Sequence, residues 1–412
     1  MLAIKHPRCA GLDVHKRQIT VCRLTPGPGR ELQAEVRTFG TMTRDLLALS
    51  DWLTQGGCTH VVMESTGVYW KPVYNLLEGS FTLLLVNPEH VKALLGRKTD
   101  VRDAERLAYL LARDELSGSF VPDREQRELR ELTRYRTVLI RERTAEVNRL
   151  QKTLEGANLK LASVASSVQG KSAQAMLAAL AGGETDPEVL AEHAKGRLRE
   201  KLPELKEALR GCVGEHQRFM LAQHLAHLAE LEERIREVSE EVAQRLLPFE
   251  AKLRRLEQQP GVGRRTAEIL AAELGLDMSR FPTHRHCAAW AGMCPGQHES
   301  AGKRKRCATL RGSPWLREAL VEAARAASRV KDSYSAAQYQ RLTRRRGTRR
   351  AAVAVGHSIL VSSYYILKDD REYVDLGRHY FDERDREQIT RQNVRRLRQL
   401  GYEVELREAV AA

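Results

Sequence analysis

The first 115 residues alternate short apolar runs with amphipathic segments. Apolar runs bounded by turn residues are typical of strands, whereas apolar positions repeating every three or four residues are typical of helices. By these criteria the predicted strands lie at 9–14, 18–24, 35–39, 60–64 and 81–86, and the predicted helices at 44–55, 69–78 and about 99–113. The resulting order, β-β-β-α-β-α-β-α, predicts an α/β domain over residues 1–115.

Residues 116–255 are highly charged and mostly helical in pattern, so we expect a helical connector there. Apolar residues within it recur at alternating spacings of three and four, the pattern of a coiled-coil seam. The seam consists of Leu221, Leu228, Leu231, Ile235, Val238 and Val242. It fits a helix that packs within its own chain as well as a coiled coil between chains. Residues 156–214 have weaker periodicity and receive no assignment.

The rest of the chain predicts a mainly α-helical domain over 256–367 and a helical tail over 368–412. Residues 260–263 read Pro-Gly-Val-Gly between two helical patterns, which predicts a helix-hairpin-helix. A loop rich in small residues follows at 292–312, before further helices.

The charge of the chain is unevenly distributed. Lys and Arg number 68 against 54 Asp and Glu, a formal net charge of +14. Residues 300–350 alone hold 15 Lys and Arg against three acids. A soluble surface needs no such clustering, so we expect a polyanionic partner, most simply nucleic acid.

Several other classes are disfavoured. No apolar run approaches the roughly 18 residues of a membrane span, and the N-terminus lacks the apolar region of a secretory signal. We therefore expect a cytoplasmic protein with no membrane association. The seven cysteines include no CxxC pair, which argues against a disulfide framework and a standard zinc site.

Four carboxylates stand where these elements can bring them together. Asp13 lies in the first predicted strand, and Glu64 closes a buried one, where an unpaired acid is costly. Asp100 and Asp103 are three positions apart on one predicted helix and share a face. Such oxygen ligands suit Mg²⁺, and a pair of ions can support phosphodiester displacement. Each acid taken alone also has an ordinary explanation, as a turn residue or in a first helical turn.

Glycines and cations form the predicted nucleic-acid surface. Glycines in the hairpin turn let backbone N–H groups approach a phosphate at a helix N-terminus, although such a turn is also common punctuation. The candidate nucleic-acid-binding residues are Gly261, Gly263, Lys303, Arg304, Lys305, Arg306, Arg344, Arg345, Arg346, Arg349 and Arg350.

Three of the motifs around the carboxylates resemble a known family. GLDVHK contains Asp13, MESTGVY contains Glu64, and RKTDVRDA contains Asp100 and Asp103; together they resemble the DEDD transposases of the IS110 insertion-sequence family. The resemblance implies a RuvC-like N-terminal domain with the RNase H fold. It also implies that these four acids are catalytic Mg²⁺ ligands.

The resemblance extends to the loop that precedes the basic segment. The family's C-terminal domain carries a G-x-x-P-x-x-x-x-S pattern, which Gly292, Pro295 and Ser300 match. Ser300 alone would be an ordinary loop serine beside cations. The resemblance implies that it attacks DNA and holds it as a covalent phosphoserine, which preserves bond energy for rejoining.

The family also implies partners. These are donor and target DNA, a structured non-coding bridge RNA that chooses the sequence, and a homo-oligomer, a dimer or tetramer, that joins the acidic domain of one subunit to the serine domain of another. A bacterial, nucleoid-associated location follows from the same resemblance.

We therefore predict a transposase that cuts and rejoins DNA for insertion-sequence mobility. Two rivals remain open at this point. One is a metal-dependent nuclease or Holliday-junction resolvase without a serine nucleophile, and the other is a non-catalytic nucleic-acid-binding protein.

Overall fold

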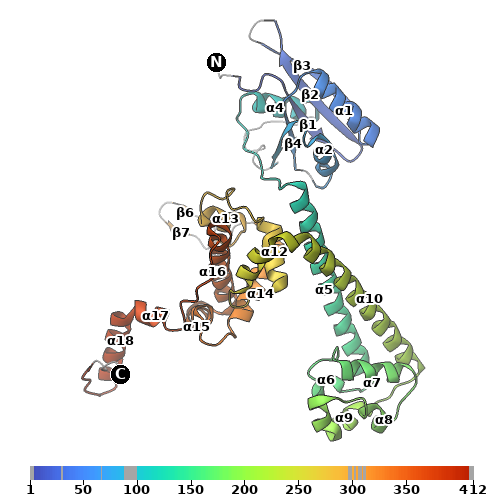
Figure 1. Cartoon of the computed structure of the whole chain (residues 1–412), viewed down its shortest axis with the longest axis vertical. Coiled ribbons are helices and arrows are strands. Elements are labelled where there is room, and N and C mark those ends of the chain that lie inside the picture. The colour runs from blue at the N-terminus through green and yellow to red at the C-terminus, as the bar shows by residue number, and fades with distance from the viewer. Residues whose placement is uncertain are drawn as a thin grey trace. The chain divides into compact units, whose positions relative to one another are not determined.

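The structure, a computed structural model, divides into two compact units, Met1–Arg124 and Glu125–Ala412 (Figure 1). It describes residues 4–28, 31–65, 67–87, 100–295, 299–300, 303–304, 309 and 312–407, with the side chains of 100–102, 299–300 and 303–304 excepted.

The N-terminal unit is a five-stranded sheet with helices on both faces. Its elements are β1 (Cys9–Val14), β2 (Gln18–Pro26), β3 (Leu32–Gly40), α1 (Thr43–Gln55), β4 (His60–Glu64), α2 (Trp70–Leu77), β5 (Thr82–Val86) and α4 (Asp100–Ala112). Over the described residues, this confirms the element order predicted from the sequence. The sheet order is β3-β2-β1-β4-β5, with β1, β2 and β3 antiparallel and β1, β4 and β5 parallel.

The two faces of the sheet bury different helices. Leu12 and Met63 pack with α1 and α2 in one apolar cluster, whereas Cys9 and Val62 pack with α4 in another. Successive side chains of a strand point to opposite faces, so one sheet can fill both layers. The N-terminal unit is therefore a three-layer α/β/α arrangement, and α4 alone among these helices contributes to the second cluster.

The C-terminal unit is almost entirely helical. Its elements are α5 (Arg124–Gly156), α6 (Leu161–Val164), α7 (Lys171–Ala181), α8 (Pro187–Ala191), η1 (Gly196–Lys201), α9 (Leu202–Leu209), α10 (Glu215–Leu246), η2 (Leu247–Phe249), α11 (Glu250–Glu257), α12 (Arg264–Leu274), α13 (His284–Trp290), β6 (Glu299–Ser300), β7 (Lys303–Arg304), α14 (Pro314–Ala327), α15 (Tyr334–Arg346), α16 (Thr348–Asp369), α17 (Tyr380–Arg384) and α18 (Arg386–Gln399).

The long helices α5 and α10 lie side by side and form a stalk (Figure 1). The seam predicted on α10 faces α5: Leu231 and Ile235 pack against Leu139, and Val242 joins a cluster with Leu129. The structure therefore supports the intrachain alternative for this seam, because its apolar side chains pack within the chain and only Val238 is half-buried. A polar layer interrupts the contact, where His224 Nδ1 lies 2.6 Å from Glu146 Oε1.

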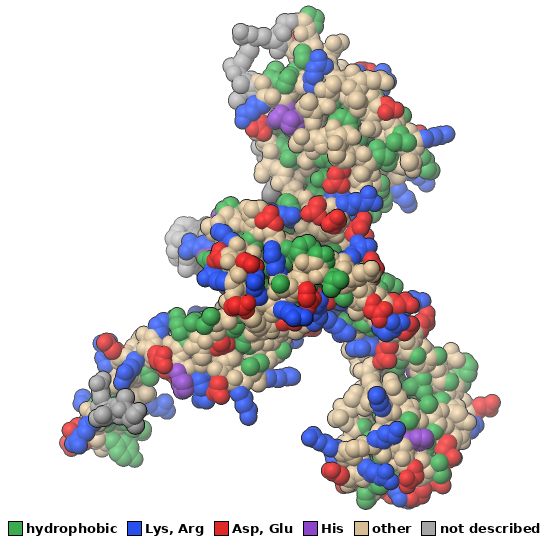
Figure 2. Space-filling model, viewed as in Figure 1, with side chains coloured by type: hydrophobic (Ala, Val, Ile, Leu, Met, Phe, Trp, Pro, Cys, Tyr) green, Lys and Arg blue, Asp and Glu red, His purple; other side chains and the backbone are tan. Residues whose placement is uncertain are grey.

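Residues 156–214, for which the sequence predicted no elements, form a small helical head between the stalk helices. Helices α6 to α9 surround a core of their own, which includes Leu161, Met176, Leu190 and Leu205, and the ends of α5 and α10 complete it. On the face drawn in Figure 2, positive and negative side chains are interspersed over this head. The weak periodicity of its sequence reflects short helices that bury small apolar residues on several sides.

Helix α16 is the central helix of the remaining helical core. Val355, Ile359, Leu360 and Tyr364 pack against α12, α13 and α14 in the largest apolar cluster. Among the described residues it is the one helix long and apolar enough to cross a membrane, but 56% of its most apolar window is buried inside the protein. Burial of this kind is what the core helix of a globular unit requires.

Candidate functional site

Two of the four predicted acids occupy neighbouring strands at one edge of the sheet. Leu12 of β1 pairs in parallel register with Met63 of β4, so Asp13 and Glu64 are the next positions on adjacent strands. Because side chains alternate between faces, both acids lie on the face opposite Leu12 and Met63, which is the face covered by α4.

Helix α4 crosses this face in the direction that brings its N-terminal turn toward the acids. Cys9 Sγ lies 3.5 Å from the backbone oxygen of Ala108, and a Cβ on Gly11 would lie 2.3 Å from the backbone oxygen of Ala104. Progress along β1 therefore corresponds to progress backward along α4. The next step along β1 is Asp13, and the next turn back along α4 contains Asp100 and Asp103.

The close approach of α4 depends on a missing side chain. A Cβ on Gly11 would also lie 2.5 Å from the backbone nitrogen of Ala108 and 2.9 Å from Leu107 Cβ. Only glycine lets the helix rest directly on the strand at this point.

The individual acids differ in exposure and in how much of their geometry is described. Asp13 is 17% exposed, and its Oδ2 lies 3.1 Å from His15 Nε2. Glu64 is half-buried at the end of β4, and Asp103 is half-buried in the first turn of α4. Asp100 begins α4, and its side chain lies outside the described residues. Among the side chains that are described, no group of three or more His, Cys, Asp and Glu is arranged to hold a metal ion.

Carboxylates at the carboxyl edge of parallel strands are oxygen donors of the kind that hard divalent cations prefer. Asp13, Glu64 and Asp103 are all partly accessible, which a metal site open to a substrate needs. The donor set therefore fits a divalent metal in chemical type, and Asp100 stands three residues before Asp103 on the same helix.

Ser300 lies in a β-hairpin, where the sequence predicted a loop. It belongs to β6 and pairs with Lys303 of β7, and a bridge between Pro295 and Thr309 closes the base of the hairpin. The side chains of Ser300, Lys303 and Arg304 lie outside the described residues, as do Lys305 and Arg306 entirely. The backbone pairing places Ser300 at the end of β6, opposite Lys303, the first residue of the basic segment.

A buried carboxylate supports the C-terminal end of this hairpin segment. Glu273 of α12 is 1% exposed, and Arg134 donates to both of its oxygens at 2.7 and 2.9 Å. Ser313, the N-cap of α14, donates to Glu273 Oε2 at 3.0 Å. One buried anion thus joins α5, α12 and the start of α14, and sequence reasoning missed it because its partners are about 40 and 140 residues away.

Helices α11 and α12 lie on either side of residues 260–263, where the sequence predicted a helix-hairpin-helix. Gly261 has a φ of +81°, and a Cβ there would lie 2.2 Å from the backbone oxygen of Ala323. Its glycine therefore serves the packing of the turn against α14. Gly263 is exposed, has open space around it and caps α12.

The first turn of α12 carries two arginines, although cations are unfavourable at a helix N-terminus. Arg264 is neutralised by Glu250 and Glu268, at 2.7 and 3.0 Å. The pKa of the Arg265 guanidinium lies below its usual value, because partial burial and the nearby Arg136 and Arg143 disfavour its charge. A local excess of positive charge therefore accompanies Gly263, and the Gly-Arg-Arg sequence after the turn was the signal that could have indicated it.

The remaining predicted cations flank the junction between α15 and α16. All five are exposed and make no ion pair with a described residue: Arg344, Arg345 and Arg346 in the last turn of α15, and Arg349 and Arg350 in the first turn of α16. Arg344, Arg345 and Arg346 suit the negative end of their helix, but Arg349 and Arg350 oppose the dipole of theirs. Helix stability therefore does not account for Arg349 and Arg350, whereas an anionic ligand would.

Comparison with known proteins relates both regions to transposases. Residues 10–159 match a DEDD IS110 family model described as "Transposase", and residues 253–340 match one described as "Transposase IS116/IS110/IS902 family". The first range contains all four acids, and the second contains the hairpin turn and Ser300.

Two curated proteins are similar along most of the chain. A Pseudomonas aeruginosa protein named "Probable family 20 transposase" is 29% identical over 304 residues, which cover 72% of this chain and 80% of the relative. A Coxiella burnetii protein named "Transposase for insertion sequence element IS1111A" is 29% identical over 311 residues, covering 73% of this chain and 75% of the relative.

Proposed function

Since the chain belongs to the IS110 transposase family, we propose that it cuts and rejoins DNA with two groups of residues, the acids of the N-terminal unit and Ser300 of the C-terminal unit. The observation that carries the proposal is the register of β1 and β4 together with the direction of α4. These bring Asp13, Glu64 and the first turn of α4 to one edge of the sheet.

The four acids would hold a divalent metal ion, for which Mg²⁺ is the candidate that best suits carboxylate oxygens. Bound there, the metal would neutralise charge on a phosphodiester group and favour its displacement. The chain's own contribution is orientation: Gly11 seats α4 on β1, and His15 beside Asp13 holds that carboxylate in place.

Ser300 would be the nucleophile of strand cleavage. Its Oγ would form a bond to the phosphorus, the bond from phosphorus to one strand oxygen would break, and the serine proton would end on the departing hydroxyl. Rejoining reverses this with a hydroxyl from another strand, so no external energy source is needed. Lys303 and Arg304 follow in the same hairpin and would stabilise the charge that develops on the phosphate.

DNA strands would lie along the cations that precede and follow α16 and across the turn before α12. Arg344, Arg345, Arg346, Arg349 and Arg350 would contact phosphates, and the backbone of Gly263, with Arg265, would add a contact at a helix N-terminus. We further propose, on family resemblance, a bridge RNA that selects the sequence and an oligomer that joins the two sites. Because the α10 seam packs against α5, we place the contacts of that oligomer on another surface.

The test of the acidic site compares Asp103→Asn with wild type on DNA that carries the element ends. We expect Asp103→Asn to abolish strand cleavage while leaving DNA affinity within about twofold, since a neutral amide is a poor metal ligand. Asp51→Asn, an exposed position on α1, is the matched control and should cleave normally. Normal cleavage by Asp103→Asn would rule out this metal site.

The test of the nucleophile is capture of the protein–DNA adduct under denaturing conditions. Ser300→Ala should form no adduct, and Ser80→Ala, an exposed serine of the N-terminal unit, should form it as wild type does. An adduct that persists in Ser300→Ala would indicate another nucleophile, and cleavage without any adduct in wild type would indicate a metal-dependent nuclease.

A further inference from the structure

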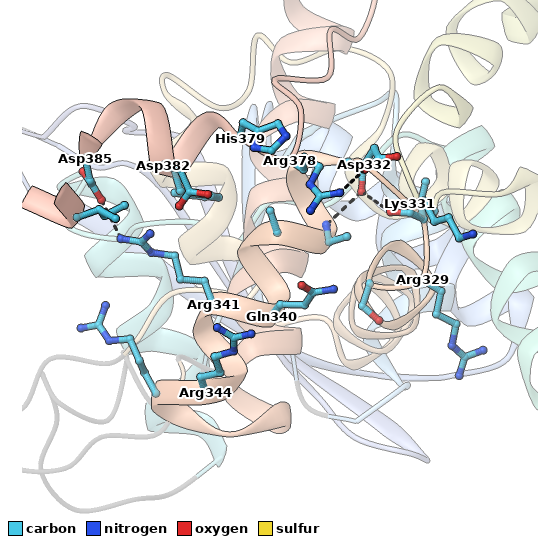
Figure 3. A pocket seen from close by; sticks show the side chains of 18 of the residues that line it. Arg329, Lys331, Asp332, Gln340, Arg341, Arg344, Arg378, His379, Asp382 and Asp385 are labelled. Atoms are coloured by element: carbon cyan, nitrogen blue, oxygen red, sulfur yellow. Dashed lines mark hydrogen bonds and ion pairs between the residues drawn. The ribbon is translucent and has the colours of Figure 1, made fainter. Parts of the chain in front are cut away.

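A groove of about 960 Å³ lies between α15 and the C-terminal tail helices α17 and α18 (Figure 3). Residues 328–345 form one wall, and residues 378–392 form the other. Of the lining residues, six are Lys or Arg and three are Asp, so positive charge is in excess. The tail wall lies outside the residues that the sequence indicated as nucleic-acid-binding.

The groove is built by specific contacts between its walls. The ring of Tyr334 stacks on Phe381 at 5.0 Å, and Arg341 binds Asp385 at 2.8 Å, as Figure 3 shows for the second pair. The Tyr334 backbone N–H donates to Asp375 at 2.8 Å, which ties the segment before α17 to the start of α15. These contacts hold the tail against α15 without filling the space between them.

Only two of the six cations have anionic partners within the groove. Arg341 pairs with Asp385, and Arg378 pairs with Asp332 at 2.9 Å. The other four make no ion pair with any described residue: Arg329, Lys331, Arg344 and Arg345. Like charges that line one hollow repel each other, and a bound anion would relieve that repulsion.

We propose that this groove binds the sugar–phosphate backbone of a single nucleic-acid strand, clamped between α15 and the tail. The inference rests on the proposed function for the presence of nucleic acid, and adds the form of the ligand and the role of the tail. A volume of this size encloses a drug-sized molecule, which has the bulk of a few nucleotides of one strand, and is too small to enclose a duplex. Unpaired cations along a groove are the usual means of following a single strand.

The polar lining supports a sequence-tolerant contact. Gln340 of α15 and Gln388 and Gln392 of α18 line the groove and can donate or accept hydrogen bonds with sugars and base edges. The aromatic rings nearby, Tyr334 and Phe381, are stacked on each other, so they anchor the tail and are not free to stack with bases. Affinity should therefore depend strongly on salt and weakly on sequence.

The first experiment removes cations from the α15 wall of the full-length protein. Arg344→Gln with Arg345→Gln should lower affinity for labelled oligouridylate and oligothymidylate by about tenfold near 0.1 M salt, and reduce the salt slope by about 1.4, since each phosphate contact on a single strand contributes about 0.7. Binding to a duplex of mixed sequence should change by less. Arg199→Gln with Lys201→Gln in η1 removes equal charge elsewhere and should change neither.

The second experiment tests the tail wall by adding negative charge to it. Gln388→Glu with Gln392→Glu keeps helix propensity and side-chain size, and should weaken single-strand binding by about fivefold through repulsion of phosphates. Gln223→Glu with Gln244→Glu on exposed positions of α10 is the matched control and should bind as wild type.

The outcomes separate the alternatives. Loss confined to single strands supports the proposal, and the strand that loses more, RNA or DNA, is the natural occupant. Equal loss on the duplex, unchanged single-strand binding in either variant, or displacement of the strand by polyglutamate at equal charge would overturn it. Cleavage by Asp103→Asn reports separately on the proposed function, so failure of one does not obscure the other.

Discussion

Gly11 lies directly against the backbone of α4, and Gly11→Ala should therefore disturb both the fold and the acidic site. The added Cβ would lie 2.3 Å from the backbone oxygen of Ala104, whereas ordinary contacts begin near 3.4 Å. The obstructing atoms belong to the helix backbone and cannot rotate away. Helix α4 would have to retreat by about 1 Å, together with the turn that holds Asp100 and Asp103.

The expected cost follows from overpacking. Inserting a methyl group into a tight interface costs about 1–3 kcal/mol, and occasionally more where backbone must move. Alanine has a smaller conformational entropy than glycine in the unfolded state, and this stabilises the folded protein by less than about 1 kcal/mol. We expect a net loss of about 2 kcal/mol for the N-terminal unit, which raises the population of its open state about 30-fold.

Buried cysteines provide the assay. Cys9 and Cys22 lie beside Gly11 on β1 and β2, are fully buried, and burial raises the pKa of each thiol to about 12. Only an exposed thiolate reacts with iodoacetamide, so labelling at neutral pH measures opening of the layer beneath α4. Gly11→Ala should accelerate labelling of both thiols about 30-fold, while Cys287 of the C-terminal unit keeps its wild-type rate.

The same variant should lose catalysis. Displacement of catalytic groups by about 1 Å can reduce the rate on the order of 100-fold. Gly156→Ala is the matched control, because a Cβ there meets nothing within 4 Å at the end of a helix, and it should be neutral or slightly stabilising. Wild-type labelling of Cys9 together with wild-type cleavage in Gly11→Ala would refute the placement of α4 on β1.

Three further predictions concern the C-terminal unit. Glu273→Gln removes the buried anion from Arg134 and should lower the free energy of unfolding of the C-terminal unit, measured by thermal unfolding, by about 2–3 kcal/mol. The same variant should form the protein–DNA adduct more slowly, while its DNA affinity stays normal. Although burial opposes the shift, hydrogen bonding with His224 lowers the pKa of Glu146. The stabilisation of the stalk by Glu146 is therefore present at neutral pH and lost as pH falls below the usual carboxyl range. Hydrogen exchange of α10 should increase at that low pH, and Glu146→Gln should abolish this pH dependence. Arg265→Gln relieves like-charge repulsion, so the melting temperature should hold or rise while duplex affinity falls about threefold; a falling melting temperature would mean that the residue serves the fold.

The local patterns were sufficient to predict the N-terminal unit. Strand and helix order followed from apolar runs, and Glu64 was conspicuous because an acid at the end of a buried strand needs a partner. The positions of Asp13 and Asp103 on their elements were also predictable. Their meeting at one edge was not, because it depends on the β1–β4 register and on the missing side chain of Gly11.

The stalk shows the limit of periodicity. The spacing of Leu231 and Ile235 predicts that one face of α10 is buried, but it does not predict which helix covers that face. The structure pairs it with Leu139 of α5, about 90 residues earlier in the chain. The head between these helices was equally hidden, since its short helices bury small residues in no regular period.

Local composition and spacing were therefore enough to predict the elements of the N-terminal unit, the type of each chemical group and the sign of the net charge. Tertiary structure alone decided which groups face each other. Glu273 can join three helices because Arg134 and Ser313 donate hydrogen bonds to it, and the tail groove exists because Asp385 and Phe381 pack on α15. Contacts between distant segments are set by the packing of whole helices and sheets, and no local pattern encodes them.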